Sequence, residues 1–314
     1  MRAMILAAGL GTRLRPLTLE RPKAFLPVPH EPLLAHGVQR LVDAGVRAIG
    51  INLHTLAPIA EAMLERLAPA TVPLFVFREG RLLGTGGGPR AARAWLCEPG
   101  EPVLLVNGDV VCASDWSRAI ELHRRTGAVA TMLLRADPRA VEHGAVDIAP
   151  LDAMRPPDAC REGIVRRLLG RPERRGEPLR TLMFTGLHVL DPEALAQMPL
   201  DGCIVRSAYR RWVDEGRVVA AVVDDGPWWD IGTPASYAAA CFAAVDGALG
   251  APTAAVHSDA FVHPGARLER CVVGPGARIG PAARLRECIV WPGVRVNEPV
   301  ERSVVTRHWR VSFA

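Results

Sequence analysis

The residues best suited to binding a phosphate group lie near the N-terminus. The segment LAAGLGTRLRPLT (6–18) places Gly9 and Gly11 where a predicted strand ends. Glycines there let backbone N–H groups approach a phosphate or a base, and the Arg13 guanidinium can contact a phosphate with two hydrogen bonds. The segment has neither the third glycine of a dinucleotide-binding loop nor the GK[ST] of a Walker loop. The alternative interpretation is an ordinary turn between a strand and a helix.

Lys23 is the second candidate, because it is the only lysine among the 38 Lys and Arg residues of the chain. It follows Arg13 by ten residues, and prolines at 16, 22, 27 and 29 restrict the backbone around it. A lysine ammonium is a compact charge on a long stem and binds phosphate as a point charge. The alternative is a surface lysine whose stem covers apolar atoms.

These side chains need a scaffold, and the sequence predicts a layered one. Apolar runs at 3–8, 48–52, 73–77, 102–109 and 130–134 alternate with helical periodicity at 33–45 and 59–67. This alternation predicts a parallel sheet covered by helices on both faces, with ligands bound beyond the carboxyl ends of the strands. Residues 150–180 are rich in Pro and Arg without a clear period, and we interpret them as an insertion or a loop that faces the substrate.

The C-terminal part has a repeat of its own. A helix predicted at 234–249 is followed by aliphatic residues five or six positions apart, and Val262, Ile279 and Val296 are each 17 residues apart. The recurring HPGARL, GPGARI and WPGVRV resemble the hexapeptide repeat of a left-handed β-helix. A small β-meander is the alternative. We therefore predict an α/β, Rossmann-like domain with a mostly parallel sheet over 1–250 and a short left-handed β-helix over 251–314.

Composition excludes several classes of protein. The net charge is +5, but the arginines are dispersed and aromatic residues make up only 5%, which argues against a nucleic-acid-binding protein. No apolar run reaches the length of a membrane span, and the apolar N-terminus has no cleavage site after it. The seven cysteines form no CxxC pair, which argues against a disulfide framework or a zinc site. We expect a cytoplasmic protein.

Taken together, GxGTRLRPLT and the following RPK and LPV resemble the signature of the sugar-1-phosphate nucleotidyltransferases. Four more segments match that family in the same order: LLGTGGGPRAA (82–92), VLLVNGDV (103–110), FTGLHVLDP (184–192) and WWDIGTP (228–234). The resemblance covers nearly all of residues 1–245. It implies an enzyme that joins a nucleoside triphosphate to a sugar 1-phosphate and releases pyrophosphate, with Mg²⁺ as cofactor.

The resemblance also implies roles for individual residues. Arg13, Lys23 and Asp109 are the implied catalytic residues, and Asp109 and Asp230 are the implied ligands of Mg²⁺. The implied substrate-binding residues are Ala8, Gly9, Gly11, Thr12, Gly84, Thr85, Gly86 and Gly87 for the nucleotide, and Asn107, Gly144, Asp147, Arg171 and Gly186 for the sugar phosphate. The N-terminus of the helix that follows Gly84 also favours an anion.

The chain departs from the family at one place. Many members have Glu-Lys-Pro before the sugar-contacting strand, whereas this chain has Gly170, Arg171 and Pro172, so Arg171 takes the place of the phosphate-binding lysine. The chain resembles both N-acetylmuramate-1-phosphate uridylyltransferases and mannose-1-phosphate guanylyltransferases, which leaves the base open between U and G. The alternatives are a non-catalytic regulatory subunit that binds nucleotide sugars and a hexapeptide acyltransferase. We expect the tail to pack on the catalytic domain or on another subunit of a homo-oligomer.

Overall fold

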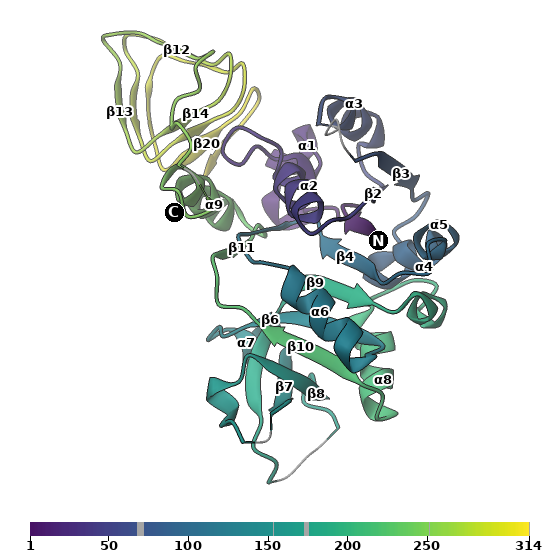
Figure 1. The fold of residues 1–314 in the computed structure, drawn as a ribbon. Helices are drawn as coiled ribbons and strands as arrows, with labels where there is room; N and C mark the ends of the chain where they lie inside the picture. Colours follow the sequence, from purple (N-terminus) through teal and green to yellow (C-terminus); the bar gives the residue numbers. More distant parts are fainter. Residues whose placement is uncertain (68–71, 153, 173–175, 251, 314) are drawn as a thin grey trace.

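The structure is a computed structural model that describes residues 1–67, 72–152, 154–172, 176–250 and 252–313. Figure 1 shows an α/β domain built on one large sheet, with a small coil of short strands beside it. The sheet has the strand order β3-β2-β1-β4-β9-β6-β10-β8-β7. Its strands are β1 (Arg2–Leu6), β2 (Ala48–Leu53), β3 (Leu74–Arg78), β4 (Val103–Asn107), β6 (Ala130–Arg135), β7 (Ala145–Pro150), β8 (Glu162–Leu168), β9 (Arg180–Leu190) and β10 (Val219–Val223).

The sheet is mostly parallel, as the apolar strands predict. Strand β1 pairs in parallel with β2 and β4, and β2 with β3. Strand β9 runs antiparallel between β4 and β6, and β8 runs antiparallel to β10 and β7. The other strands therefore share one direction, and their carboxyl ends lie along one edge of the sheet.

One end of the sheet closes on itself. Strand β9 pairs with β6 along one side, while its other side pairs first with β7 and then with β4. Because β7 also pairs with β8, β8 with β10 and β10 with β6, these five strands form a closed ring. Apolar side chains such as Leu134, Val146 and Val223 are fully buried in the core of this end.

Helices cover both faces of the sheet. Alternate residues of β1 enter different cores, Ala3 and Ile5 on one face and Met4 on the other. The helices are α1 (Leu17–Glu20), α2 (Leu33–Asp43), α3 (Ala57–Leu67), α4 (Gly84–Ala91), α5 (Arg93–Cys97), α6 (Ser117–Thr126), α7 (Ala140–His143), α8 (Arg210–Asp214) and α9 (Pro234–Val245). Helix α9 ends four residues before the predicted end. No described helix is both long and apolar enough to span a membrane.

The C-terminal strands form a three-sided parallel coil. Three short sheets have the orders β12-β15-β18, β13-β16-β19 and β14-β17-β20-β21. The first three strands of each sheet are parallel and come from successive turns of the chain, and β21 closes the third sheet antiparallel to β20. The strands are β12 (Phe261–Val262), β13 (Arg267–Glu269), β14 (Val272–Val273), β15 (Arg278–Ile279), β16 (Arg284–Arg286), β17 (Ile289–Val290), β18 (Arg295–Val296), β19 (Pro299–Glu301), β20 (Ser303–Val305) and β21 (Arg310–Ser312). Parallel pairing excludes the β-meander. The left-handed sense stays a prediction.

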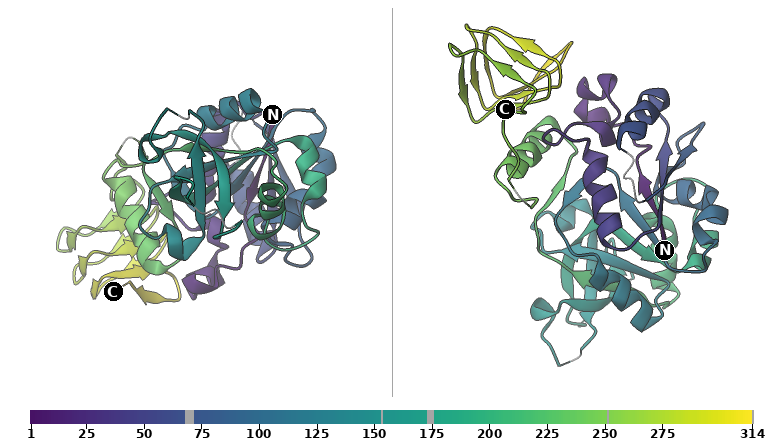
Figure 2. Two further views of the ribbon diagram at one scale, coloured as in Figure 1. Left: turned by 90° about the horizontal axis from the view of Figure 1, so that it is seen from below. Right: turned by 45° about the horizontal axis from the view of Figure 1, so that its top comes forward.

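The coil packs against the segment that carries Lys23. Figure 2 shows the coil beside α9 and the N-terminal helices. The hydroxyl of Tyr237 donates to the Pro27 carbonyl at 2.7 Å and accepts from Trp291 Nε1 at 3.1 Å. Leu14 and Leu26 belong to the same apolar core as coil residues. The α/β domain and the coil therefore share one apolar core, although the architecture changes near residue 250.

Residues 150–180 are more regular than predicted. They contain a 3₁₀ turn (Pro157–Ala159) and strand β8, which fills a place in the ring. Of the two interpretations, an insertion or a loop that faces the substrate, the loop does not hold for β8. Along β8 the burial alternates, so that Gly163, Val165 and Leu168 are buried while Arg166 and Arg167 are half-buried. All seven cysteines are free thiols.

Candidate active site

The first glycine-rich loop is shaped by Gly11. Its φ of 60° is left-handed, and a Cβ built on it would lie 2.8 Å from Thr18 Cγ2 and 3.1 Å from Lys23 Cβ. The Thr18 hydroxyl donates to the Gly11 carbonyl at 2.9 Å. Glycine is therefore required for the loop to pack on the Lys23 segment. Thr12 follows it as an exposed residue at the start of a 3₁₀ turn.

Lys23 forms an ion pair with Asp109 across the carboxyl edge of the sheet. Its Nζ lies 2.6 Å from Asp109 Oδ2, and the side chains are 12% and 34% exposed. Lys23 begins a 3₁₀ turn whose next residues, Ala24 and Phe25, are buried, which fixes the direction of its stem. Asp109 follows β4, where Gly108 N donates to the Leu6 carbonyl at 2.9 Å. The solitary lysine is thus joined to a carboxylate 86 residues away.

Asp109 directly precedes strand β5 (Val110–Cys112), and Asp230 lies on the strand that pairs with β5. Asp230 ends β11 (Trp228–Asp230), which runs antiparallel to β5 and places Asp230 opposite Val110. The backbone N–H of Ile231 donates to the Asp109 carbonyl at 2.9 Å. Carboxylate oxygens suit Mg²⁺, which usually takes one or two of them together with water and phosphate oxygens. The pair fits that ion, and no cluster of three or more His, Cys, Asp or Glu suited to a metal occurs in the described chain.

The Arg13 side chain lies against the segment that carries Asp230. Its guanidinium lies against the backbone of Gly232, where a Cβ would be only 3.0 Å from Arg13 Nη2. Gly232 N donates to Ser236 Oγ, and Thr233 with Ser236 forms the capping box of α9. The WWDIGTP segment therefore carries Asp230 and also supports the arginine.

A cavity of about 280 Å³ lies beside these charged groups. Its walls bring together residues of both glycine-rich segments and of three strand ends. The lining consists of Leu6, Ala8, Gly9, Asn52, Leu82, Gly84, Thr85, Asn107 and Asp109. A smaller neighbouring hollow is lined by Gly9, Lys23 and Asp109, among others. Six of the sequence-predicted residues, Ala8, Gly9, Gly84, Thr85, Asn107 and Asp109, thus meet in one cavity, and we interpret it as a nucleotide pocket.

Gly86 and Gly87 face away from this cavity, toward a distant segment of the chain. A Cβ on Gly86 would lie 2.6 Å from Pro199 Cγ, and one on Gly87 would lie 2.5 Å from the Leu200 carbonyl oxygen. Gly86 N donates to the Gly202 carbonyl at 3.0 Å, so this N–H already has a partner. Both glycines permit close packing of α4 on residues 199–202.

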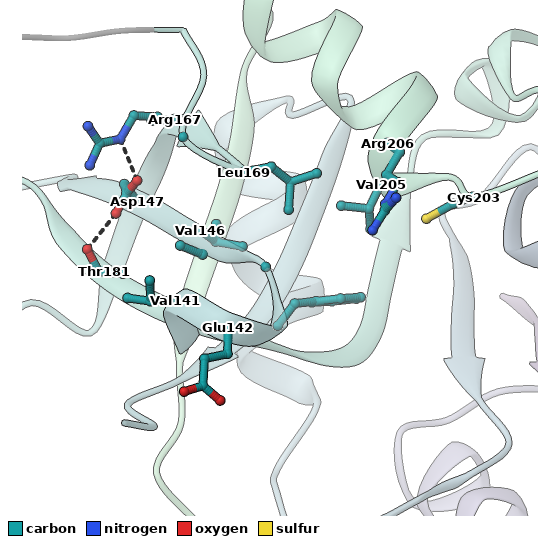
Figure 3. Close-up of a pocket in the computed structure, with 14 residues that line it drawn as sticks. Val141, Glu142, Val146, Asp147, Arg167, Leu169, Thr181, Cys203, Val205 and Arg206 are labelled. Carbon is teal, nitrogen blue, oxygen red and sulfur yellow. Dashed lines mark hydrogen bonds and ion pairs between the residues drawn. The ribbon is translucent and has the colours of Figure 1, made fainter. Parts of the chain in front are cut away.

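A larger cavity, of about 820 Å³, lies over the closed end of the sheet (Figure 3). Gly144 and Asp147 line it, as do Thr181, Arg167 and Arg206. Asp147 Oδ2 accepts from Arg167 Nε at 2.6 Å and Oδ1 accepts from Thr181 Oγ1 at 2.6 Å. The hydrogen bond with the Asp147 carboxylate raises the pKa of Arg167. The predicted sugar-contacting aspartate is therefore a buried wall residue with both oxygens engaged.

The two cavities share a wall. Thr85 Oγ1, in the smaller cavity, accepts from the backbone N–H of Ile204 at 3.1 Å, and Cys203 and Arg206 line the larger one. Gly186, with φ 96°, lies against Asn107, and a Cβ there would be 2.8 Å from Asn107 Nδ2. The predicted Gly186 thus makes room for a residue of the nucleotide pocket.

Arg171, like Gly86 and Gly87, is a predicted residue that the structure does not bring to the described lining of either cavity. It is exposed on the turn after β8, where Leu168 and Arg171 exchange backbone hydrogen bonds. Gly170, next to it, does line the larger cavity. The cations at that wall are Arg167 and Arg206, which sequence reasoning missed because nothing in their local sequence distinguishes them from other surface arginines.

Arg139 is a further cation missed from the sequence. Hydrogen bonds from Arg139 lower the pKa of Asp137 to about 2, and the carboxylates of Asp137 and Asp230 raise the pKa of Arg139. Its charge therefore acts on the Asp230 carboxylate.

Comparison with known proteins agrees with this arrangement. Residues 2–245 match the family model described as Nucleotidyl transferase. The chain belongs to the nucleotidyl transferase family. The N-acetylmuramate alpha-1-phosphate uridylyltransferase of Caulobacter vibrioides is 32% identical over 241 residues, which cover 76% of this chain and 94% of that protein.

A mannose-1-phosphate guanylyltransferase catalytic subunit beta, from Drosophila pseudoobscura pseudoobscura, is 27% identical over 237 residues, 75% of this chain and 60% of that protein. This nucleotidyl transferase chain thus spans about three fifths of the length of such relatives. Among solved structures, UDP-glucose pyrophosphorylase complexed with UDP-glucose superposes with a TM-score of 0.63 at 18% identity, covering 78% of this chain and 98% of that one. That likeness establishes the shared fold.

Proposed function

We propose that the chain is a Mg²⁺-dependent sugar-1-phosphate nucleotidyltransferase. The observation that carries the proposal is the convergence of Arg13, Lys23, Asp109 and Asp230 beside a cavity lined by both glycine-rich segments. Two cations and two carboxylates from four separate segments meet where parallel strands end, which is the usual ligand site of such sheets.

In the proposed reaction an oxygen of the sugar phosphate attacks the α-phosphorus of the nucleoside triphosphate. The bond between the α-phosphorus and the bridging oxygen breaks, and pyrophosphate leaves with the electron pair. Both reactants are polyanions, so Arg13 and Lys23 would reduce their repulsion and stabilise charge on the leaving pyrophosphate. Asp109 and Asp230 would hold Mg²⁺, which supplies a template and further charge neutralisation. No covalent nucleophile is needed.

The nucleotide would occupy the smaller cavity and the sugar the larger one. The relatives leave two substrate pairs, UTP with an N-acetylmuramate 1-phosphate type of sugar and GTP with a mannose 1-phosphate type. Arg171 lies on the outer turn, and we propose that Arg206, which lines the larger cavity, binds the sugar phosphate instead.

The proposal extends to the tail. The hexapeptide repeat and the parallel three-sided pairing together support a left-handed β-helix. We place the protein in the cytoplasm, where nucleoside triphosphates are available. We also propose that it assembles into a homo-oligomer through the coil.

The test is release of pyrophosphate from a grid of four nucleoside triphosphates and several sugar 1-phosphates, with Mg²⁺ present and then removed by chelation. We expect one pair to dominate and turnover to stop with chelation or with Asp109→Ala. Binding without turnover for every pair would favour a regulatory subunit, and full activity of Asp109→Ala would refute the catalytic assignment.

A further inference from the structure

Two buried side chains connect the two glycine-rich segments that line the nucleotide pocket. Asn52 lies near the end of β2 and is 2% exposed, and Glu79 directly follows β3 and is 8% exposed. Neither strand end carries a sequence motif that the proposed chemistry uses. The pair joins the paired strands β2 and β3 to the start of α4.

Asn52 holds the first loop. Its Oδ1 accepts from the backbone N–H of Ala7 at 2.8 Å, and Ala7 directly follows β1, two residues before Gly9. Its Nδ2 donates to Glu79 Oε1 at 2.7 Å. The amide therefore uses its acceptor on one loop and its donor on the carboxylate.

Glu79 holds the second loop. Its Oε2 accepts from the backbone N–H of Leu83 at 3.0 Å, and Leu83 is the N-cap residue directly before α4. Its own backbone is fixed on β2, because its N–H donates to the Leu53 carbonyl and its carbonyl contacts His54 Nδ1 at 2.8 Å.

Gly88 shows how closely α4 packs on this pair. A Cβ on Gly88 would lie 2.6 Å from Glu79 Oε1 and 2.9 Å from Asn52 Nδ2. Backbone and side chains here leave no space for a methyl group, so α4 is seated directly on the amide and the carboxylate.

We propose that Asn52 and Glu79 are positioning residues that set the separation of the two glycine-rich loops, and so the width of the nucleotide pocket. The inference rests on the proposed function for its substrate, a nucleoside triphosphate. Ala8 and Gly9 of the first loop, Gly84 and Thr85 of the second, and Asn52 itself all line this cavity.

Each of the three hydrogen bonds has a fixed donor and a fixed acceptor, so variants that exchange a donor for an acceptor test the proposal. Asn52→Asp places a carboxylate oxygen against Glu79 Oε1, two acceptors without a proton between them. Glu79→Gln turns an amide N–H₂ either toward Asn52 Nδ2 or toward the Leu83 N–H, so two donors face each other in both orientations.

The double variant Asn52→Asp/Glu79→Gln restores all three hydrogen bonds with the middle one reversed. The new carboxylate at position 52 accepts from the Ala7 N–H with one oxygen. With its other oxygen it accepts from the new amide at position 79, and the oxygen of that amide accepts from the Leu83 N–H. Each loop is then held as in the wild type.

The experiment measures the Kd of the preferred nucleoside triphosphate by calorimetry without sugar phosphate, and KM, kcat and Tm for the wild type, both single variants and the double variant. We expect each single variant to raise Kd and KM at least about tenfold with kcat within about threefold, and the double variant to return Kd to within about threefold of the wild type. Thr131→Val is the matched control, because it removes a buried hydrogen bond to His123 outside both cavities. It is expected to lower Tm without changing Kd.

Single variants that bind the nucleotide like the wild type would overturn the inference. So would a double variant whose Tm recovers while its Kd stays as weak as that of the singles. A wild-type protein that binds no nucleoside triphosphate would overturn the proposed function together with the inference, which distinguishes the two failures.

Discussion

Lys23→Ala separates the proposed catalytic role of this lysine from its structural one. In the structure the Lys23 ammonium makes one short ion pair, 2.6 Å from Asp109 Oδ2, at a site where Asp109 is one-third exposed. Water can replace the lost partner of a carboxylate exposed to that degree. We therefore expect the free energy of unfolding to fall by only about 1 kcal/mol, which lowers Tm by roughly 2–4 °C.

The effect on the reaction should be larger. A hydrogen bond between charged groups is worth about 1.5–3 kcal/mol, and a loss of that size in the transition state lowers the rate about 10- to 150-fold. The assay is steady-state release of pyrophosphate with the best substrate pair, together with thermal unfolding of the same preparation. Arg47→Ala is the control, because it removes an exposed ion pair with Glu101 at the opposite end of the strands.

Lys23→Arg tests the shape of the cation. The side chain has only 12% exposure, and its Nζ is already within hydrogen-bond distance of Asp109, so the longer and planar guanidinium cannot occupy the same position. We expect this variant to be impaired as well. Turnover of Lys23→Ala within about threefold of the wild type, with Arg47→Ala also normal, would refute the reasoning.

Three further variants test other contacts. Gly232→Ala should displace the Arg13 guanidinium by a few tenths of an ångström; we expect kcat/KM to fall by about fivefold or more with little change in Tm, and normal kinetics would contradict the support that Gly232 gives to Arg13. Tyr237→Phe removes the bonds to Pro27 and from Trp291; we expect urea denaturation to show a loss of about 1–3 kcal/mol in one cooperative transition, whereas two separate transitions would mean that the coil unfolds independently. Burial lowers the pKa of His188 to about 3, so the folded protein excludes a proton that the unfolded chain binds below about pH 6.5. Stability from this group is present above about pH 6.5 and is lost toward pH 3, and His188→Gln should flatten the fall of the urea midpoint between about pH 6 and 4; an unchanged slope would exclude His188 as its source.

Most of the apolar strands that the sequence predicts are buried on both faces, whereas the edge strand β3 is partly exposed and was predicted from its apolar run alone. All six residues of β2 are buried, and its run of aliphatic residues is nearly continuous. Strand β8 was missed because its apolar run, Ile164 and Val165, is short, and the consecutive Arg166 and Arg167 interrupt it before Leu168. A strand with so short an apolar run, in a segment rich in Pro and Arg, resembles a loop in sequence.

The site could be predicted only in part, for a different reason. The resemblance to a family selects Lys23 and Asp109, but their ion pair joins residues 86 positions apart and depends on how the loop folds onto β4. Gly86 and Gly87 have a glycine-rich context that suggests ligand binding, yet their partners are at 199–202, far along the chain. Asn52 and Glu79 carry no local signal, because their importance comes entirely from what they connect.

The closed ring of strands has a consequence for self-association. Because β7 pairs with β9 as well as β8, the large sheet has no unpaired strand at that end, and in the described chain β3 is left as its free edge. Strand β3 has Phe75 and Val76 at 41% and 39% exposure, which would favour pairing with another chain, and it ends in Arg78, whose guanidinium binds Glu61 on α3. A charged pair at an edge strand discourages such pairing. Any strand-to-strand aggregation through this sheet is therefore confined to one short segment, and Arg78 opposes it there.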